Sequence, residues 1–286
     1  MSARANSPPN VRATKVMDET PNAIREVEVS YLRTDTGQRE LKRDWVTMEE
    51  PFHLIVNGEH YATILSIPIQ RKELAVGYLI TEGIVQNIAE IREMRLEAQT
   101  CNVTLSPDIN IQERIQLATP FRRVIFSACS TPGEWPLYRL IDRLKIPKVS
   151  FGTVVNAKTI AETTRHFSTD ALIHSKTGGT HAAALYRADG TCIAFSEDVG
   201  RHNAVDKAIG VALIGKSSLE ESFLTSTGRI TGDIALKAAR VKIPIVASIA
   251  AAVDSGIEIA KLTDLTLIGF VRGSRMNIYT HPERIV

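Results

Sequence analysis

The second half of this 286-residue chain repeats one pattern, in which a short apolar run is followed by a segment with helical periodicity. Residues 223–226, 243–249 and 266–270 are apolar runs of the kind found in buried strands. Residues 234–241 and 257–262, which separate these runs, carry apolar side chains at helical spacing. Because strands that alternate with helices form a sheet with helices packed on it, we predict an α/β fold for this half.

Further segments extend the alternation toward the N-terminus. Residues 192–195 are predicted to form a strand, 203–213 a helix and 159–166 a weak helix. The small side chains at 181–185, which follow the turn at 177–180, are expected to begin another helix.

The first half is rich in strand signals. Residues 24–32 alternate apolar and polar side chains, as a half-buried strand does. Residues 51–56 and 59–65 are predicted to pair as a hairpin, because Asn57-Gly58 fits a two-residue primed turn. The other elements expected here are a turn at 35–37, a helix over 74–81 that stops at Gly83, and strands at 100–105, 109–117 and 122–127.

The two halves predict an α/β (α+β) protein with two domains. We expect a flexible tail over 1–22, which is polar and carries two prolines, a strand-rich N-terminal domain over 23–120, and an α/β domain over 121–286. Hydrophobic residues make up 44 % of the chain, which is enough to bury a core.

Charge and composition exclude several classes of protein. The chain has 34 basic and 32 acidic residues, a net charge of +2, which argues against a general nucleic-acid binder. It contains no apolar run of about 18 residues, so no membrane span is expected, and its polar N-terminus does not resemble a secretory signal. The three cysteines are too few for a disulfide framework and fit a reducing compartment, so we expect a cytoplasmic protein.

Residues 196–210, SEDVGRHNAVDKAIG, crowd charged and polar side chains at the start of a predicted helix. In a plain surface helix Asp198 would cap the N-terminus and Glu197 would complement the helix dipole. A crowd of this kind is also typical of a site that holds an anion at a helix N-terminus. Both interpretations stay open for the polar side chains that follow, which are Arg201, His202, Asn203, Asp206 and Lys207.

Two loops have features that favour phosphate binding. Gly178 and Gly179 precede His181, and paired glycines allow backbone amides to approach an anion. The loop at 226–229 follows a strand and supplies the charge of Arg229. Each loop could also be an ordinary turn between a strand and a helix.

A third loop, at 269–275, combines an aromatic ring with two arginines. Phe270 is suited to stacking on a base, and Arg272 and Arg275 are suited to pairing with phosphates. An exposed basic loop is the alternative. Together with the crowded helix start, the three loops predict a large anionic ligand.

Cys129 is the candidate reactive thiol. It follows an apolar run and lies in a loop of Ser, Thr, Pro and Gly, where a thiol would be exposed at a strand end. Cys101 and Cys192 lie in strand patterns and are interpreted as structural. No metal site is predicted, since the sequence has neither C-x-x-C nor H-E-x-x-H. Zinc deaminases need H-x-E, and here Ala183 stands at the Glu position, which argues against deaminase-like hydrolysis.

Several short blocks, taken together, carry a resemblance to a known family. They are Glu50-Pro51 with Val56-Asn57-Gly58, Glu73–Leu79 with Glu82-Gly83-Ile84, Thr177–Ala183, Glu197–Lys207, and Thr227-Gly228-Arg229. In these blocks the chain resembles the FdhD family, the formate dehydrogenase accessory sulfurtransferases, over nearly its whole length.

The resemblance implies a role as a sulfur carrier. Cys129 would accept a persulfide from a cysteine desulfurase and pass the sulfur to the molybdenum cofactor, bound as bis-molybdopterin guanine dinucleotide. The sulfurated cofactor would then enter formate dehydrogenase. The resemblance also implies a cytidine deaminase-like C-terminal domain and a homodimer.

The resemblance further suggests which residues bind the cofactor. Arg272 and Arg275 are expected to pair with phosphates and Phe270 to lie near guanine. His202 and Asp206 would either orient the ligand or hold the helix start. The residues expected to bind the cofactor are Phe270, Val271, Arg272, Gly273, Ser274, Arg275, Gly178, Gly179, His181, Arg201, His202 and Arg229.

One departure from the family pattern bears on the mechanism. Many members carry Cys-x-x-Cys in the loop, and here Pro132 replaces the second cysteine. A single thiol suffices to relay a persulfide, but no disulfide can form within this loop. A chaperone that only binds the cofactor is therefore the alternative function, and it would tolerate Cys129→Ser.

Overall fold

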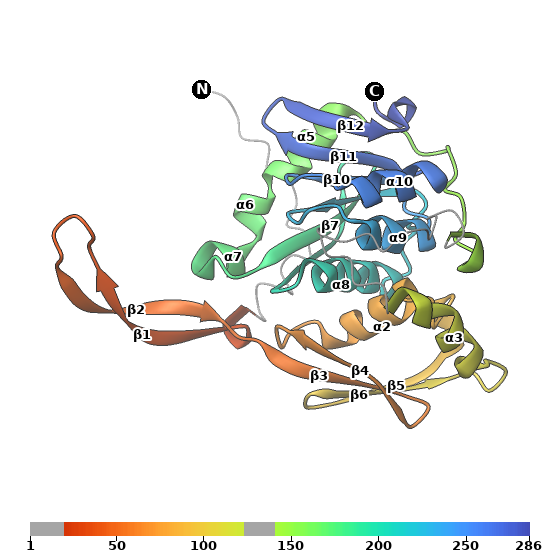
Figure 1. Ribbon diagram of the computed structural model, residues 1–286, viewed down its shortest axis with the longest axis horizontal. Coiled ribbons are helices and arrows are strands. Elements are labelled where there is room, and N and C mark those ends of the chain that lie inside the picture. Colours follow the sequence, from red (N-terminus) through yellow and green to blue (C-terminus); the bar gives the residue numbers. More distant parts are fainter. Residues whose placement is uncertain (1–19, 123–140) are drawn as a thin grey trace.

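The computed structural model describes residues 20–122 and 141–286 as a mixed α/β protein from which a two-stranded arm projects (Figure 1). Its strands are β1 (Ile24–Leu32), β2 (Arg39–Thr47), β3 (Glu50–Val56), β4 (Glu59–Ser66), β5 (Ile91–Glu97), β6 (Thr100–Leu105), β7 (His181–Arg187), β8 (Cys192–Asp198), β9 (Ser222–Ser226), β10 (Ile245–Ser248), β11 (Thr266–Arg272) and β12 (Arg275–Thr280). Its helices are α2 (Arg71–Thr81), α3 (Ile111–Arg122), α5 (Ala157–Arg165), α6 (Phe167–Asp170), α7 (Leu172–Thr177), α8 (Arg201–Ile214), α9 (Gly232–Arg240) and α10 (Asp254–Leu262), with single 3-10 turns at Thr20–Asn22, Ile88–Glu90 and Pro282–Arg284. Among these helices, none combines the length and the apolar character needed to cross a membrane.

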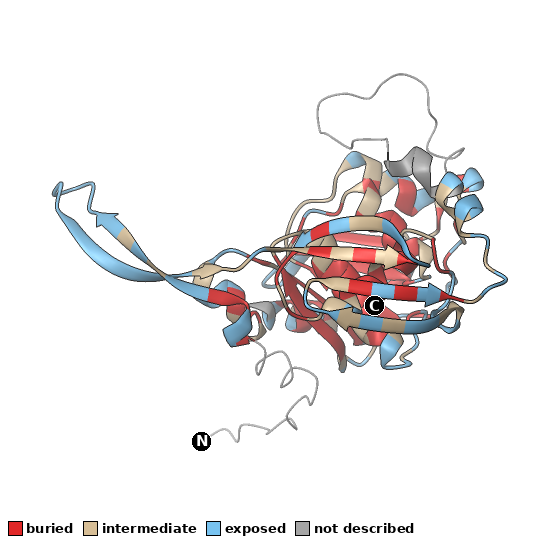
Figure 2. Cartoon of the chain, turned by 90° about the horizontal axis from the view of Figure 1, so that it is seen from below, coloured by how far each residue is buried: buried red, intermediate tan, exposed pale blue. Residues whose placement is uncertain are grey.

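The second half forms a six-stranded sheet in the order β12-β11-β10-β9-β7-β8. Strands β9, β10 and β11 run parallel, while β7 runs antiparallel to both of its neighbours. Alternate side chains of β7 enter two different cores: Leu185 packs with α8 and α9, and Ala184 packs with α5. The sheet is thus buried between two helical layers, as the red centre of Figure 2 shows, and the predicted α/β architecture of this half is confirmed.

The first half forms a four-stranded sheet in the order β4-β3-β6-β5. The predicted hairpin is present, with β3 and β4 antiparallel around Asn57, whose φ of 50° suits a primed turn. One face of this sheet packs against α2 through side chains such as Phe52, Leu54 and Leu79. Helix α2 therefore lies between the small sheet and α8 (Figure 1).

Helices α2 and α8 approach each other so closely that glycine is required at two positions. A Cβ atom on Gly77 would lie 1.8 Å from the carbonyl oxygen of Asp206, and one on Gly210 would lie 1.9 Å from that of Glu73. The two contacts pair the helices antiparallel, backbone against backbone. This crossing joins the two halves of the protein.

Two of the predicted elements are wrong in type. Residues 181–185, predicted as a helix start, belong to strand β7, because this segment is central in the sheet and buried on both faces, where packing overrides the helix propensity of alanine. Residues 109–117, predicted as a strand, fall largely in helix α3. Ile111 and Ile115 are four residues apart and pack on the core of the first half, and the Asn110 side chain accepts a hydrogen bond from the Glu113 amide at the helix start.

Other predictions about the elements have mixed outcomes. The strand and turn over 24–37 and the helices around 74–81, 159–166, 203–213, 234–241 and 257–262 are present. Strands β2, β5 and β12 were not predicted. Of the strand expected at 122–127, Arg122 ends helix α3 and the rest lies outside the described residues, as does most of the tail over 1–22. The domain limits at 23–120 and 121–286 stay a prediction.

Candidate functional site

The loops singled out in the sequence meet at one edge of the six-stranded sheet. Strands β8, β9, β10 and β11 end at this edge, and the antiparallel strand β7 begins there. We call it the carboxyl edge. In open α/β sheets, ligands bind at the carboxyl ends of the strands.

Contacts link neighbouring loops along the carboxyl edge. The ring nitrogen Nδ1 of His181 lies 3.2 Å from the hydroxyl of Thr227. The side chain of Arg201 packs against Gly228, where a Cβ atom would lie 2.7 Å from that of Arg201. At the far end of the edge, the backbone amide of Phe270 donates to the carbonyl oxygen of Ala250 at 2.9 Å. The structure thus brings His181 and Arg201 to the loop at 227–228 and places Phe270 farther along the same edge.

Much of the crowded helix start serves the fold instead of an open site. Asp198 and Lys207 form a fully buried ion pair at 2.6 Å, and Lys207 also donates to the carbonyl oxygen of Ile67. Asp198 does not cap helix α8, because Gly200 occupies the N-cap position. Glu197 is also buried and accepts hydrogen bonds from the amides of Ile173 and His174 and from the hydroxyl of Thr180. Asp198 and Lys207 therefore form a buried ion pair, Glu197 is held by amides and a hydroxyl, and all three side chains serve the fold.

Asp206 belongs to a second buried network. Its carboxylate accepts from Lys237 at 3.0 Å and from the hydroxyl of Thr81 at 2.6 Å, and Lys237 also contacts Glu82 at 3.0 Å. Burial alone lowers the pKa of Lys237, but the charges of Asp206 and Glu82 outweigh it and raise the pKa above its ordinary value. Asp206 thus ties α8 to α2 and α9, which favours a structural role over contact with a ligand.

His202 remains at the surface of the carboxyl edge and is ion-paired with Asp233 on helix α9. Burial alone would raise the pKa of Asp233, but its hydrogen bond to His202 and the charge of that ring hold the pKa well below its usual range. Thr231 also donates a hydrogen bond to this carboxylate. Sequence reasoning missed Asp233; the available signal was an acidic residue at the start of a predicted helix.

Positive charge dominates this part of the edge. Burial, and then the charges of Arg201, His174, His202 and Arg229, lower the pKa of His181. These effects favour the neutral form of the His181 ring, which lies among basic side chains. The Nε atom of Arg201 is buried and has no hydrogen-bond partner among the described residues, and Arg229 is exposed. Such a set of groups can bind an anion with several charges.

The structure also shows what the predicted glycine turn does. Gly178 has a φ of 66° and donates its amide to the carbonyl oxygen of His174, ending helix α7. The amide of Gly179 donates to the hydroxyl of Thr177 at 3.1 Å. Both amides thus already donate to acceptors within the chain, so neither is a free donor for a ligand. That this turn contacts a ligand stays a prediction.

Strands β11 and β12 form a hairpin that turns at residues 273–274, and Phe270 within β11 has a φ of 53°. The guanidinium of Arg272 lies 5.5 Å from the centre of the Phe270 ring, and its Nε donates to the carbonyl oxygen of Ile249 at 3.3 Å. Val271 is buried in the core, so its side chain does not face a ligand. Gly273, Ser274 and Arg275 are exposed.

The structure describes two of the three cysteines. Cys129 lies outside the described residues, with the rest of its predicted loop. Cys101 is buried, and burial raises the pKa of its thiol to about 11. Cys192 lies in strand β8 and is partly buried. Within the described residues, no group of three or more His, Cys, Asp or Glu side chains could hold a metal ion.

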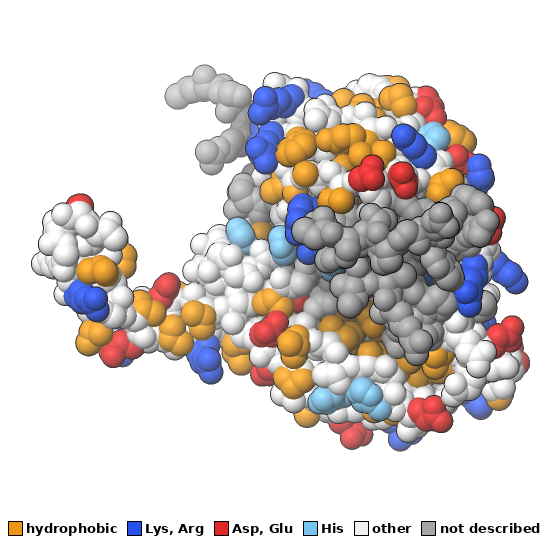
Figure 3. All heavy atoms as spheres, in the orientation of Figure 1, with side chains coloured by type: hydrophobic (Ala, Val, Ile, Leu, Met, Phe, Trp, Pro, Cys, Tyr) orange, Lys and Arg blue, Asp and Glu red, His pale blue; other side chains and the backbone are white. Residues whose placement is uncertain are grey.

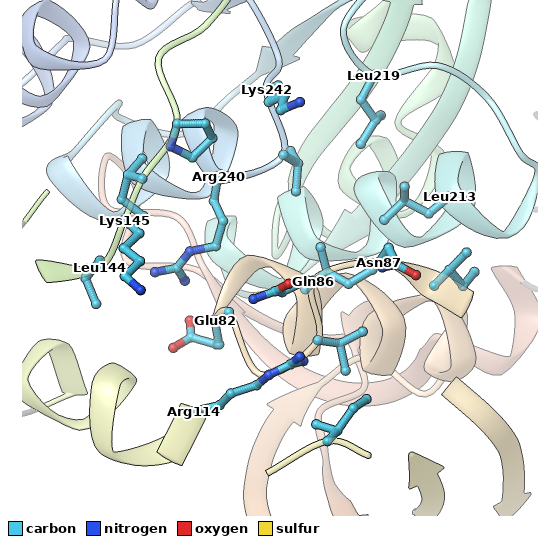
Figure 4. Close-up of a pocket in the computed structure, with 18 of the residues that line it drawn as sticks. Glu82, Gln86, Asn87, Arg114, Leu144, Lys145, Leu213, Leu219, Arg240 and Lys242 are labelled. Carbon is cyan, nitrogen blue, oxygen red and sulfur yellow. The ribbon is translucent and has the colours of Figure 1, made fainter. Parts of the chain in front are cut away.

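A cavity of about 980 Å³ lies away from the carboxyl edge, between the two halves (Figure 4). Its lining includes Arg114 of helix α3, Lys145, and two residues from the loops that precede β9 and β10, Leu219 and Lys242. The cavity therefore lies at the opposite ends of these strands. Helix α3 and residues 143–147 both contribute side chains to this lining.

We expect Arg229→Met to weaken the binding of inorganic pyrophosphate by about tenfold or more, since a hydrogen bond between charged groups would be lost. Isothermal titration calorimetry at low ionic strength measures the effect. Arg187→Met is the matched control, because Arg187 ends strand β7 at the other edge of the sheet and is also exposed. Equal affinities of the two variants would show that Arg229 does not contact the anion.

The chain is similar to known proteins of one family. The model of the FdhD/NarQ family matches residues 47–286. The chain is 37 % identical over 265 residues to the sulfur carrier protein FdhD of Sulfolobus acidocaldarius, covering 92 % of this chain and 98 % of that protein. It is 32 % identical over 250 residues to the sulfur carrier protein FdhD of Bacillus pumilus, covering 87 % and 93 %. A solved structure from Desulfotalea psychrophila, described as a formate dehydrogenase accessory protein, superposes with a TM-score of 0.74 at 25 % identity, covering 92 % of this chain and all of that one.

Proposed function

Because this chain belongs to the FdhD/NarQ family, we propose that it is a sulfur carrier that serves formate dehydrogenase. Its relatives carry the name of a sulfur carrier, and the similar structure is a formate dehydrogenase accessory protein. The observation that carries the proposal is agreement along nearly the whole chain, including the segment with the candidate thiol.

Cys129 is the proposed acceptor of sulfur. Its thiolate would attack the outer sulfur of a persulfide on a cysteine desulfurase, forming a new S–S bond while the thiolate of the donor leaves. No oxidant is needed, since the outer sulfur moves from one thiolate to another. The high pKa of the buried Cys101 thiol makes that residue a poor alternative.

The proposed substrate that receives the sulfur is the molybdenum cofactor in its bis-molybdopterin guanine dinucleotide form. This molecule is large and polyanionic and carries guanine bases. The carboxyl edge suits it: Arg201 has a buried Nε without a partner among the described residues, Arg229 is an exposed cation, and Phe270 offers a ring beside Arg272. The predicted roles of Ser274 and Arg275 depend on the same hairpin.

The remaining parts of the proposal follow from the family. A cysteine desulfurase and formate dehydrogenase are the proposed protein partners, and the chain is proposed to form a homodimer. A reducing compartment such as the cytoplasm suits a reactive thiol. A cytidine deaminase-like topology is proposed for the second half, without hydrolytic activity, because Ala183 is buried where such an enzyme needs Glu.

A cofactor-binding chaperone without sulfur chemistry is the second candidate. It is favoured by Pro132, which leaves the Cys129 loop with a single cysteine. Such a chaperone would use the carboxyl edge but not Cys129.

The deciding experiment measures the intact mass of the protein after incubation with a cysteine desulfurase and free cysteine. We expect wild type to gain one sulfur atom and Cys129→Ala to gain none, while Cys192→Ala serves as the matched control and behaves as wild type. A gain in Cys129→Ala would move the acceptor to another cysteine. No gain in any variant would favour the chaperone.

A further inference from the structure

The β1–β2 arm is exposed to solvent over most of its length. It projects far beyond the body in Figure 1, and Figure 2 shows it exposed over most of its length. Every residue from 39 to 45 in β2 is exposed. Within the described residues, β1 and β2 pair with each other and with no third strand. A two-stranded hairpin is marginally stable in water by itself. We therefore expect an arm of two nine-residue strands to be stabilised by a binding partner.

The arm also exposes large apolar side chains, which appear as orange patches along it in Figure 3. Leu41 is 71 % exposed and Trp45 is 43 % exposed, and both belong to β2. Tyr31 and Leu32 near the end of β1 are 45 % and 43 % exposed. Aromatic and leucine side chains on a free strand favour pairing with another strand.

The sequence of β2 has an internal symmetry that points to a second copy as the partner. Two antiparallel copies of a strand are related by a twofold axis perpendicular to the sheet, so each side chain keeps its face. In an antiparallel pair, directly opposed residues lie on the same face of the sheet. The twofold axis must therefore place one residue opposite its own copy, and it cannot lie midway between two consecutive residues. Few registers of β2 against itself therefore exist.

One register gives complementary pairs on both sides of the axis. With the axis at Arg43, Lys42 opposes Asp44 of the second copy and Leu41 opposes Trp45, and each pair occurs twice. Arg43 opposes itself, and its charge is already compensated by Glu26 on β1 at 2.9 Å. Opposite charges and apolar pairs placed directly across from each other stabilise a sheet.

The neighbouring registers are worse. With the axis at Lys42, Glu40 would oppose Asp44, two like charges. With the axis at Asp44, Arg43 would oppose Trp45 and Lys42 would oppose Val46, so the charge pairs are lost. The free edge of β1 is less suitable, because Val27 and Val29 are only half exposed and an axis at Glu28 would pair that carboxylate with itself.

We propose that two copies of this chain join through β2, antiparallel and centred on Arg43, into a four-stranded sheet in the order β1-β2-β2-β1. This names the surface of the homodimer included in the proposed function, yet it does not depend on sulfur transfer. The base of the arm touches the glycine turn, since the hydroxyl of Thr47 lies 2.7 Å from that of Thr177. The dimer would therefore connect two carboxyl edges through their arms.

Disulfide trapping tests the register directly. Opposed Cα atoms in antiparallel strands lie about 4.5 to 5.5 Å apart, within the range a disulfide accepts. In a full-length Cys129→Ser background, Arg43→Cys should form a covalent dimer when copper phenanthroline and air are added. Asp35→Cys, at the tip of the arm and outside the paired region, is the matched control and should stay monomeric on a denaturing gel.

Charge exchange gives a second test that needs no cysteine. Lys42→Glu and Asp44→Lys each place like charges opposite one another, and each should raise the dimer dissociation constant by about tenfold or more. The double variant restores the opposite charges and should recover the affinity, as measured by analytical ultracentrifugation. Lys42 also contacts Glu40 within its own strand, so recovery in the double variant separates the contact between copies from this internal one.

Three outcomes decide whether the two copies meet through β2. A covalent Arg43→Cys dimer together with recovery by the double variant supports it. A wild-type dimer that neither crosslinks at residue 43 nor responds to the charge exchange would place the interface elsewhere. A wild-type chain that is monomeric at micromolar concentration would overturn both the interface and the homodimer, and would leave the arm for a different protein.

Discussion

Asp206→Ala is expected to lower the free energy of unfolding by about 3–5 kcal/mol, because it leaves the ammonium group of Lys237 buried without its main partner. Asp206 is 1 % exposed and Lys237 is 6 % exposed, so water cannot take the place of the carboxylate. Glu82 and the hydroxyl of Thr81 would remain near the lysine, but Glu82 lies at the rim of the network. Urea denaturation followed by far-UV circular dichroism measures the loss.

A matched control and a double variant define the cause. Glu220 pairs with Lys242 at 2.9 Å, and both side chains are about half exposed, so Glu220→Ala should cost less than about 1 kcal/mol. The double variant Asp206→Leu with Lys237→Met removes both buried charges and should be more stable than Asp206→Ala. If the losses of the two single variants simply add in a double-mutant cycle, the buried pair is not the source of the effect.

The other buried ion pair, between Asp198 and Lys207, illustrates what the sequence could predict about the site and what it could not. The sequence could predict that the candidate loops lie near one another, because glycines and basic residues follow predicted strands and the ends of parallel strands lie together. It could not show that Asp198 and Lys207 are partners. Their ion pair depends on how α8 packs against α2 and against Ile67 after β4, and this packing joins segments from both halves of the chain.

The errors in the predicted elements have a similar cause. A periodic segment such as α10 could be predicted, since Ile259 and Ala260 on one helix face meet the core while Glu258 and Lys261 meet solvent. Strand β7 could not, because it is buried on both faces and therefore has no alternation to detect. Strand β2 carries charges at most positions and lies outside any core, so no apolar pattern marks it.

Gly210→Ala is expected to lower the free energy of unfolding by about 3 kcal/mol or more, or to prevent folding. In an isolated helix the same change would stabilise by about 1 kcal/mol, because alanine is the better helix former. Here the new Cβ atom would lie 1.9 Å from the carbonyl oxygen of Glu73, a backbone atom that cannot rotate away. Helices α2 and α8 must separate, and overpacking of this kind costs about 1–3 kcal/mol even where side chains can adjust.

The sign of the change in the free energy of unfolding tests whether the two halves are joined by direct backbone contact. Gly77→Ala on the facing helix should behave like Gly210→Ala, because its Cβ atom would lie 1.8 Å from the carbonyl oxygen of Asp206. Gly152→Ala is the matched control, because its new Cβ atom would meet no neighbouring atom within 4 Å. Its free energy of unfolding should stay within about 0.5 kcal/mol of that of wild type. Urea denaturation of the three variants makes the comparison. If Gly210→Ala is as stable as wild type, then α2 and α8 do not approach this closely in solution, and the packing that holds Arg201 and His202 at the carboxyl edge is looser than the structure shows.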